Sequence, residues 1–200
     1  MRLYQPRDQV RKYTCGPSCI ANALALYGIP TSQEEAQGAC ETGKDGTNED
    51  DLKKGLRKLG FYPMTRESVK RSDNQRILKW AKAQTDQGRF VICSINGEGS
   101  EGHWVLILNI SRAGVMVWNP SYAYPEIVTK RNLFQAWWGV DFGYPGLKSG
   151  IWAVALAPRT KILKRAAEIR KALTFPKKGK LPVDKGHPEP GPTTTQVEGT

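Results

Sequence analysis

The 200-residue chain is 39% hydrophobic, which is enough for one globular core and favours a single domain. No apolar run approaches the roughly 18 residues of a membrane helix, and the N-terminus lacks the apolar centre of a signal peptide, so we expect no membrane span. The net charge is +11, and after Ala157 ten Lys and Arg stand against four Asp and Glu, so the basic character is concentrated at the C-terminus. A cytoplasmic protein is expected, or a virion-associated one if it is phage-encoded.

The first half of the chain is predicted to be helical. A helix is predicted directly after Cys15, with Gly16 as its N-cap and Pro17 as its first helical residue, and it ends at Gly28, so Cys15 lies at a helix N-terminus. Three further helices are predicted over residues 31–40, 48–60 and 72–88, with Ser32 and Asn48 as the caps of the first two.

The second half changes to strand-length apolar runs rich in Val and Ile. An antiparallel sheet is predicted over residues 89–96, 103–110, 114–120 and 151–157, with a tight hairpin at 111–114 and a helix at 129–139. The expected fold class is therefore α+β, with an N-terminal helical half packed on a C-terminal antiparallel sheet within residues 1–157.

The C-terminal residues differ in composition from the rest. Residues 158–175 are predicted to form a basic amphipathic helix, and residues 176–200 are a Pro-, Gly- and Thr-rich tail that buries almost nothing. Such a basic segment can contact nucleic acid, an acidic partner or a membrane surface, although solvated surface is more common. A second hypothesis follows: the chain is a non-catalytic or tethered component of a larger assembly, of phage or virion type, docked through this segment.

The position of Cys15 predicts a nucleophile. Helix N-termini and neighbouring imidazoles lower the pKa of a thiol, and His103 is the only histidine outside the tail. Sixteen residues later Asn119 ends the return strand of the hairpin, so its amide oxygen is expected to accept the Nδ1 proton of His103. Gln9 and the N–H of Cys15 are candidate donors to an oxyanion.

Each of these residues also has a plain structural explanation. Cys15 can be a small buried residue, His103 a satisfied surface histidine, Asn119 a turn residue before proline, and Gln9 an ordinary loop residue. Cys19, Cys40 and Cys93 are expected in the core, and the cysteines fit no common zinc pattern. Most tryptophans are expected in the core as well, with Trp104 shielding the site from water. The acidic residues Asp45 and Glu49 to Asp51 favour a solvated helix start over a metal loop.

Several segments, taken in order, resemble the papain-like cysteine peptidases, in particular the bacteriocin-processing, double-glycine-leader peptidases (peptidase C39-like). The resemblance rests on QVRKYTCGPSCIANAL, YGIPTSQEE, KDGTNEDDLKKGLRKLGF, GHWVLILNI and VWNP, and it covers about Gln5 to Ala157. It implies a thiol peptidase with a Cys15–His103–Asn119 triad, Gln9 as oxyanion donor, a polypeptide substrate and no metal or organic cofactor. Acyl transfer on the same thiol is an alternative to hydrolysis.

This sequence departs from the leader peptidases in two respects. They usually have Asp where this chain has Asn119, which is the residue of papain-type enzymes. They are also usually part of an exporting transporter with membrane helices and an ATPase, and neither accompanies these 200 residues. The double-glycine substrate is therefore not carried over.

Overall fold

The computed structural model describes residues 8–96, 102–122, 124–137 and 151–158. In chain order its elements are α1 (Cys15–Leu26), α2 (Gln33–Cys40), α3 (Glu49–Lys58), β1 (Phe61–Ser68), the 3-10 helix η1 (Arg71–Asp73), α4 (Asn74–Asp86), β2 (Val91–Asn96), β3 (Gly102–Ile110), β4 (Val115–Trp118), β5 (Pro125–Val128), α5 (Lys130–Trp137) and β6 (Ile151–Pro158).

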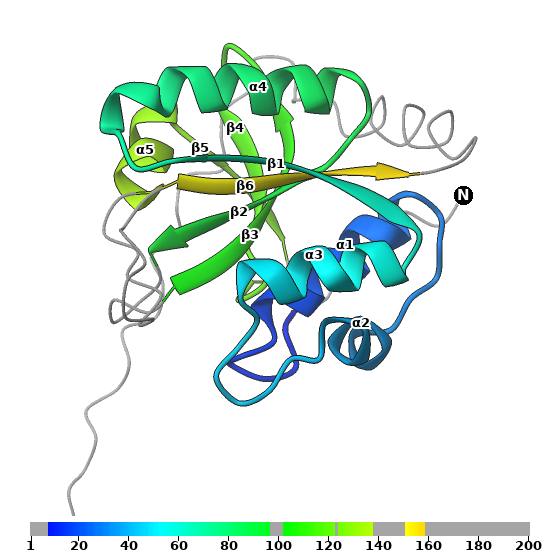
Figure 1. Cartoon of the computed structure of the whole chain (residues 1–200). Coiled ribbons are helices and arrows are strands. Elements are labelled where there is room, and N and C mark those ends of the chain that lie inside the picture. Colours follow the sequence, from blue (N-terminus) through cyan, green and yellow to red (C-terminus); the bar gives the residue numbers. More distant parts are fainter. Residues whose placement is uncertain (1–7, 97–101, 123, 138–150, 159–200) are drawn as a thin grey trace, which may run out of the picture.

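The six strands form one antiparallel sheet in the order β1-β6-β2-β3-β4-β5. Helices α1 to α3 lie on one side of the sheet, and α4 and α5 lie on the other (Figure 1). Each side buries its own apolar cluster, so the sheet is the middle of three layers. The α+β class predicted from the sequence is confirmed.

Strand β3 is buried on both faces, which explains its continuous apolar sequence. Trp104 and Leu106 pack into the cluster under α1 to α3, whereas Val105 and Ile107 pack into the cluster under α4 and α5. Side chains of a strand alternate between faces, so a strand in the middle layer needs apolar residues at every position. The start of β3 therefore has a fixed place against α1.

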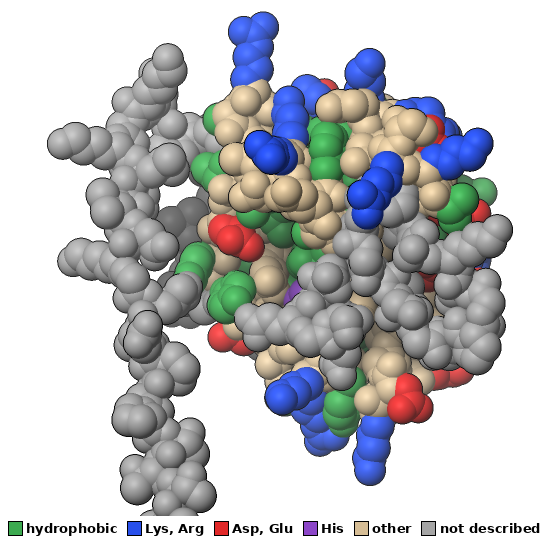
Figure 2. All heavy atoms as spheres, turned by 90° about the vertical axis from the view of Figure 1, so that its left-hand side faces the viewer, with side chains coloured by type: hydrophobic (Ala, Val, Ile, Leu, Met, Phe, Trp, Pro, Cys, Tyr) green, Lys and Arg blue, Asp and Glu red, His purple; other side chains and the backbone are tan. Residues whose placement is uncertain are grey.

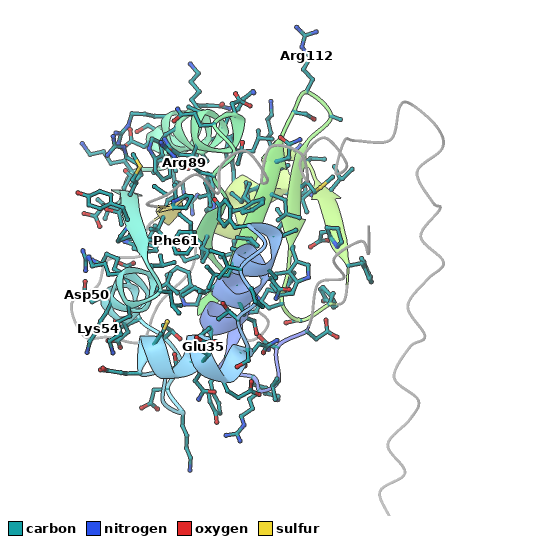
Figure 3. All side chains as sticks on the ribbon, turned by 90° about the vertical axis from the view of Figure 1, so that its right-hand side faces the viewer. Glu35, Asp50, Lys54, Phe61, Arg89 and Arg112 are labelled. Atoms are coloured by element: carbon teal, nitrogen blue, oxygen red, sulfur yellow. The ribbon has the colours of Figure 1, made fainter. Side chains whose placement is uncertain are left out.

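Helices α1 to α3 follow from their end signals and their burial. The Ser32 hydroxyl accepts a bond from the Glu35 N–H at 3.0 Å, and Asn48 Oδ1 accepts one from the Asp51 N–H at 2.9 Å, so both predicted caps are confirmed. Figure 3 shows Phe61 pointing inward behind α3, while Asp50 and Lys54 point outward from that helix. Every residue of α1 except Ala25 is buried, so α1 is a core helix.

Three details of the predicted elements were wrong. Helix α1 begins at Cys15 itself and its N-cap is Thr14, so Gly16 is the second helical residue and not the cap. The first half also contains a strand, β1, which pairs along its whole length with β6. Pro63 and the polar residues of β1 hid it, but a proline is tolerated in β1 because β1 is an edge strand. Strand β5, at the other edge, was also missed.

The C-terminal predictions lie outside the described residues, apart from Pro158, which ends β6. The basic helix at 158–175, the tail at 176–200 and the assembly role built on them therefore stay predictions. Within the described part, Lys and Arg side chains gather over the upper part of the face in Figure 2. No helix among the described residues is long and apolar enough to cross a membrane.

Candidate active site

Cys15 is the first residue of α1 and its side chain is only 6% exposed. Burial raises the pKa of its thiol above the ordinary value, and backbone N–H groups of Trp104, Gly16 and Cys15 itself act in the opposite direction. The sequence-based expectation of a lowered pKa is therefore wrong for the resting protein, because the loss of solvation outweighs these N–H groups.

The N-terminus of α1 is pressed against the start of β3. A Cβ placed on Gly16 would lie 3.1 Å from Thr47 Cβ and 3.2 Å from Trp104 Cδ1, closer than ordinary contacts. The Trp104 indole N–H also donates to the Thr47 carbonyl at 2.8 Å, which fixes the ring in that position. Gly16 therefore lets the start of α1 approach Thr47 and Trp104 closely.

His103 and Asn119 meet at one end of the β3–β4 pair. Their side chains are joined by a 2.8 Å contact between His103 Nε2 and Asn119 Oδ1. The same Asn119 oxygen accepts the backbone N–H of Ser121 at 3.0 Å, which identifies the atom facing the ring as the acceptor oxygen. Nε2 must then carry the hydrogen, and in the neutral ring the lone pair belongs to Nδ1. We had expected the Nδ1 proton to bond Asn119; the ring has the opposite orientation.

Gln9 docks beside Asn119 through its backbone. Its N–H donates to the carbonyl of Pro120 at 2.7 Å, so the segment before α1 is tied to the residue that follows Asn119. The side-chain oxygen of Gln9 is buried and has no hydrogen-bond partner within the described part of the chain. Most buried polar atoms are paired in folded proteins, so the unpaired oxygen of Gln9 is an exception next to the candidate site.

These contacts link the four predicted site residues through their sequence neighbours. The Cys15 thiol meets the N–H of Trp104, the neighbour of His103; His103 bonds Asn119; and Gln9 bonds the neighbour of Asn119. Sequence reasoning did not identify the Trp104 N–H as a group near the sulfur. No sequence signal would have shown it, because any residue in that strand position presents the same backbone group.

The remaining cysteines are core residues, as expected from the sequence. All four thiols of the chain are free, and Cys19, Cys40 and Cys93 are each fully buried. Burial raises the pKa of Cys40 and of Cys93 to about 12. Among the described residues, no group of three or more His, Cys, Asp or Glu side chains is placed to hold a metal ion.

Comparison with solved structures finds the same fold in proteins of low sequence identity. The peptidase domain of Streptococcus ComA, a bifunctional ABC transporter of a quorum-sensing pathway, matches with a TM-score of 0.56 and 20% identity over 78% of this chain and 99% of that one. A double-glycine-motif protease from an AMS/PCAT transporter, solved with a leader peptide, matches at 0.54 and 16% identity over 78% and 94%. A C39-like peptidase from Bacillus anthracis matches at 0.56 and 12% identity, with the same coverage.

The sequence itself matches the profile of the Peptidase C39 family over residues 4–141, which is more than half of the chain. A comparison with curated protein sequences gives no match. The resemblance inferred from the motifs around Cys15 and His103 is thereby confirmed. This chain belongs to the peptidase C39 family and is a cysteine peptidase with a papain-like α+β fold.

Proposed function

We propose that the chain hydrolyses peptide or isopeptide bonds with Cys15 as nucleophile, His103 as general acid and base, and Asn119 as the residue that orients the imidazole. The observation that carries the proposal is the bond between His103 Nε2 and Asn119 Oδ1, because it leaves the basic nitrogen of His103 free of a proton in the neutral ring. The N–H of Cys15 and the side chain of Gln9 are the proposed donors to the oxyanion.

Catalysis begins with transfer of the Cys15 thiol proton to His103 Nδ1. This transfer is required because burial holds the thiol above its ordinary pKa in the resting protein. The sulfur then attacks the substrate carbonyl carbon, and the carbonyl electrons move onto oxygen. Donation from the Cys15 N–H and from the Gln9 amide stabilises that oxyanion.

The tetrahedral intermediate collapses when the imidazolium returns its proton to the leaving amine. The carbon–nitrogen bond breaks, and a thioester to Cys15 remains. Water, deprotonated by His103, attacks the thioester, the carboxylic acid leaves and the thiol is restored. Throughout the cycle Asn119 Oδ1 accepts the Nε2 hydrogen, so the ring keeps one orientation in both of its protonation states.

A polypeptide is the proposed substrate. Members of this family act on polypeptides, and the AMS/PCAT protease was solved with its leader peptide, although 16% identity transfers no cleavage motif. Tyr122 and Tyr124 support the proposal: both rings are exposed and stacked with centroids 6.3 Å apart, and they follow Asn119 by three and five residues. They offer an apolar surface to substrate side chains beside the proposed triad.

The test compares the wild-type chain with Cys15→Ala and Cys19→Ala. All three chains are incubated with casein and, separately, with p-nitrophenyl acetate. A nucleophilic thiol attacks the acetyl group of this ester and releases p-nitrophenolate. Cys15→Ala is expected to abolish casein cleavage and the p-nitrophenolate burst. The intact mass of the wild-type chain should rise by one acetyl group, and that of Cys15→Ala should not. Cys19→Ala, the matched control from the same helix, should keep both activities. Cleavage by Cys15→Ala at the wild-type rate would refute the proposal.

Hydrolysis and acyl transfer are separated by a competing amine. Added glycinamide would appear in the product of an acyl transferase in preference to water, whereas a hydrolase releases free carboxylic acid. We propose hydrolysis, so the acid is the expected product.

A further inference from the structure

Gln33 holds the chain on both sides of Gln9. Its side-chain Nε2 donates to the carbonyl of Asp8 at 2.5 Å, and its Oε1 accepts the N–H of Val10 at 3.1 Å. One amide group therefore bonds the residue before and the residue after Gln9. Gln33 lies at the start of α2, so this link crosses from a different element to the segment that precedes the nucleophile helix.

The same amide is also tied to the nucleophile helix. Gln33 Oε1 accepts the hydroxyl of Ser18 at 2.7 Å, and Ser18 is a fully buried residue one turn after Cys15. The Gln33 side chain thus connects the backbone around Gln9 with helix α1. Gln33 itself is 9% exposed. Buried polar groups of this kind cost free energy unless each is paired, and here both ends of the amide are paired.

The chemistry of the three bonds requires an amide at position 33. Oε1 meets two donors and Nε2 meets an acceptor, so an ionised carboxylate would face the Asp8 carbonyl oxygen without a hydrogen between them. A hydrocarbon side chain would leave the N–H of Val10 and the carbonyl of Asp8 without these bonds. The residue type is therefore specified by the backbone that it holds.

We propose that Gln33 is the positioning residue of the oxyanion site: by bonding Asp8, Val10 and Ser18 together, it sets the place of the Gln9 amide relative to Cys15. This rests on the proposed function. The backbone N–H of Gln9 is bonded to the Pro120 carbonyl, and its side-chain oxygen has no hydrogen-bond partner in the described part of the chain, so the bonds that Gln33 makes to Asp8 and Val10 are the polar contacts that hold the backbone on both sides of it. A donor aimed at developing charge must be placed in advance, and Gln33 supplies that placement.

The test separates reactions that form an oxyanion from one that does not. Acetylation of Cys15 by p-nitrophenyl acetate passes through an oxyanion, whereas alkylation by iodoacetamide is a displacement at a saturated carbon and needs no oxyanion donor. Gln33→Met keeps the length of the side chain and removes all three bonds. It is expected to slow acetylation at least tenfold and to leave alkylation within twofold of wild type.

Two comparisons show whether Gln33 acts through Gln9. Cys15 should be acetylated no more slowly in the double variant Gln9→Ala with Gln33→Met than in Gln9→Ala alone. The Gln9 amide that Gln33 positions is already absent from Gln9→Ala, so the second change has no further effect. Gln37→Met is the matched control: Gln37 lies on the same helix and its Nε2 bonds a backbone carbonyl, that of Thr42 at 3.2 Å, away from Gln9. It should leave both rates unchanged.

Gln33→Glu tests the same idea without loss of length. A protonated carboxyl group has an O–H donor and a carbonyl acceptor, which can replace the one N–H donation and the accepting oxygen that Gln33 uses here, so acetylation relative to wild type should recover as the pH falls and the introduced carboxyl group is protonated. This variant also serves if Gln33→Met does not fold.

Several results would overturn the inference. Acetylation unaffected by Gln33→Met, acetylation and alkylation slowed by equal factors, or additive effects in the double variant would each show that Gln33 does not position Gln9. If Cys15→Ala is inactive but Gln33→Met matches wild type, the inference alone fails. If Cys15→Ala still forms the p-nitrophenolate burst, the proposed function and the inference fail together.

Discussion

The two sides of the proposed site are held in place by different forces. Cys15 is fixed by packing: it begins a buried core helix, and Gly16 lets that helix approach Trp104 and Thr47. His103 is fixed by polar bonds at a strand end, where Asn119 Oδ1 holds its ring and Ser121 holds Asn119. Burial raises the pKa of the Cys15 thiol, whereas the polar bonds orient the imidazole that we propose as its base.

Because of this difference, we expect variants on the two sides to affect catalysis and folding differently. Changes on the side of His103 and Asn119 should alter the reaction with little effect on folding, since these groups lie at the rim of the sheet. Changes around Cys15 should alter folding as well, because that side is continuous with the apolar cluster under α1 to α3. The predictions below test this separation in order of decreasing effect.

The largest effect is expected for His103→Ala. Removing the general base should lower casein cleavage about a thousandfold, within the range typical of general acid–base catalysis, and leave the thermal melting temperature within a few degrees of wild type. His187→Ala, which alters the other histidine of the chain, is the control and should cleave at the wild-type rate. A fall in the melting temperature as large as that of a core variant would show that packing, and not chemistry, is lost on this side.

A smaller effect is expected for Asn119→Ala. A hydrogen bond to a charged group contributes about 1.5–3 kcal/mol, so loss of the bond to the imidazolium should slow cleavage roughly ten- to hundredfold. Asn119→Asp keeps an acceptor oxygen and should retain more activity than Asn119→Ala. Steady-state kinetics of the two variants at pH 7 make the comparison. Equal activity of both variants and the wild type would mean that Asn119 does not hold the ring.

Much of this site was predictable because its signals are local. The cap at Ser32, the position of Cys15 at a helix N-terminus and the position of Asn119 just after strand β4 are readable from a few residues each. The ring orientation of His103 was not, because it depends on which atom of Asn119 faces it, and that is fixed by the Ser121 N–H after the chain has turned.

The contacts of Gln33 were not predictable for a related reason. They join residues 15 to 25 positions apart, and a glutamine after a helix cap carries no mark of the backbone that it will bond. Strand β1 was not predicted because its own sequence lacks a strand pattern. It forms a strand by pairing with β6, which lies about 90 residues away in the chain. Local signals therefore predicted elements and candidate residues, whereas long-range contacts decide how those residues are oriented.

The packing side is tested by a pair of glycines. Gly16→Ala adds a methyl group against Thr47 and Trp104, and overpacking of this kind costs about 1–3 kcal/mol of unfolding free energy. Gly38→Ala, in helix α2, meets nothing within 4 Å and should stabilise the protein by about 0.5–1 kcal/mol. Urea unfolding measures both. If Gly16→Ala is as stable as wild type, the helix–strand approach is looser than these contacts indicate.

The smallest effect is the titration of the Cys15 thiol itself. Its raised pKa means that the folded protein should gain thiolate absorbance at 240 nm only above the pH at which an ordinary thiol ionises, and the signal should be missing in Cys15→Ser. Burial raises the pKa of Cys40 and of Cys93 to about 12, so the comparison with Cys15→Ser is what assigns the signal to Cys15. Because the unfolded chain releases this proton first, stability should fall as pH rises between the ordinary and the raised pKa, and should fall less in Cys15→Ser. Thiolate absorbance already present at neutral pH would show instead that His103 holds the resting proton, and that the polar side of the site outweighs the burial of the sulfur.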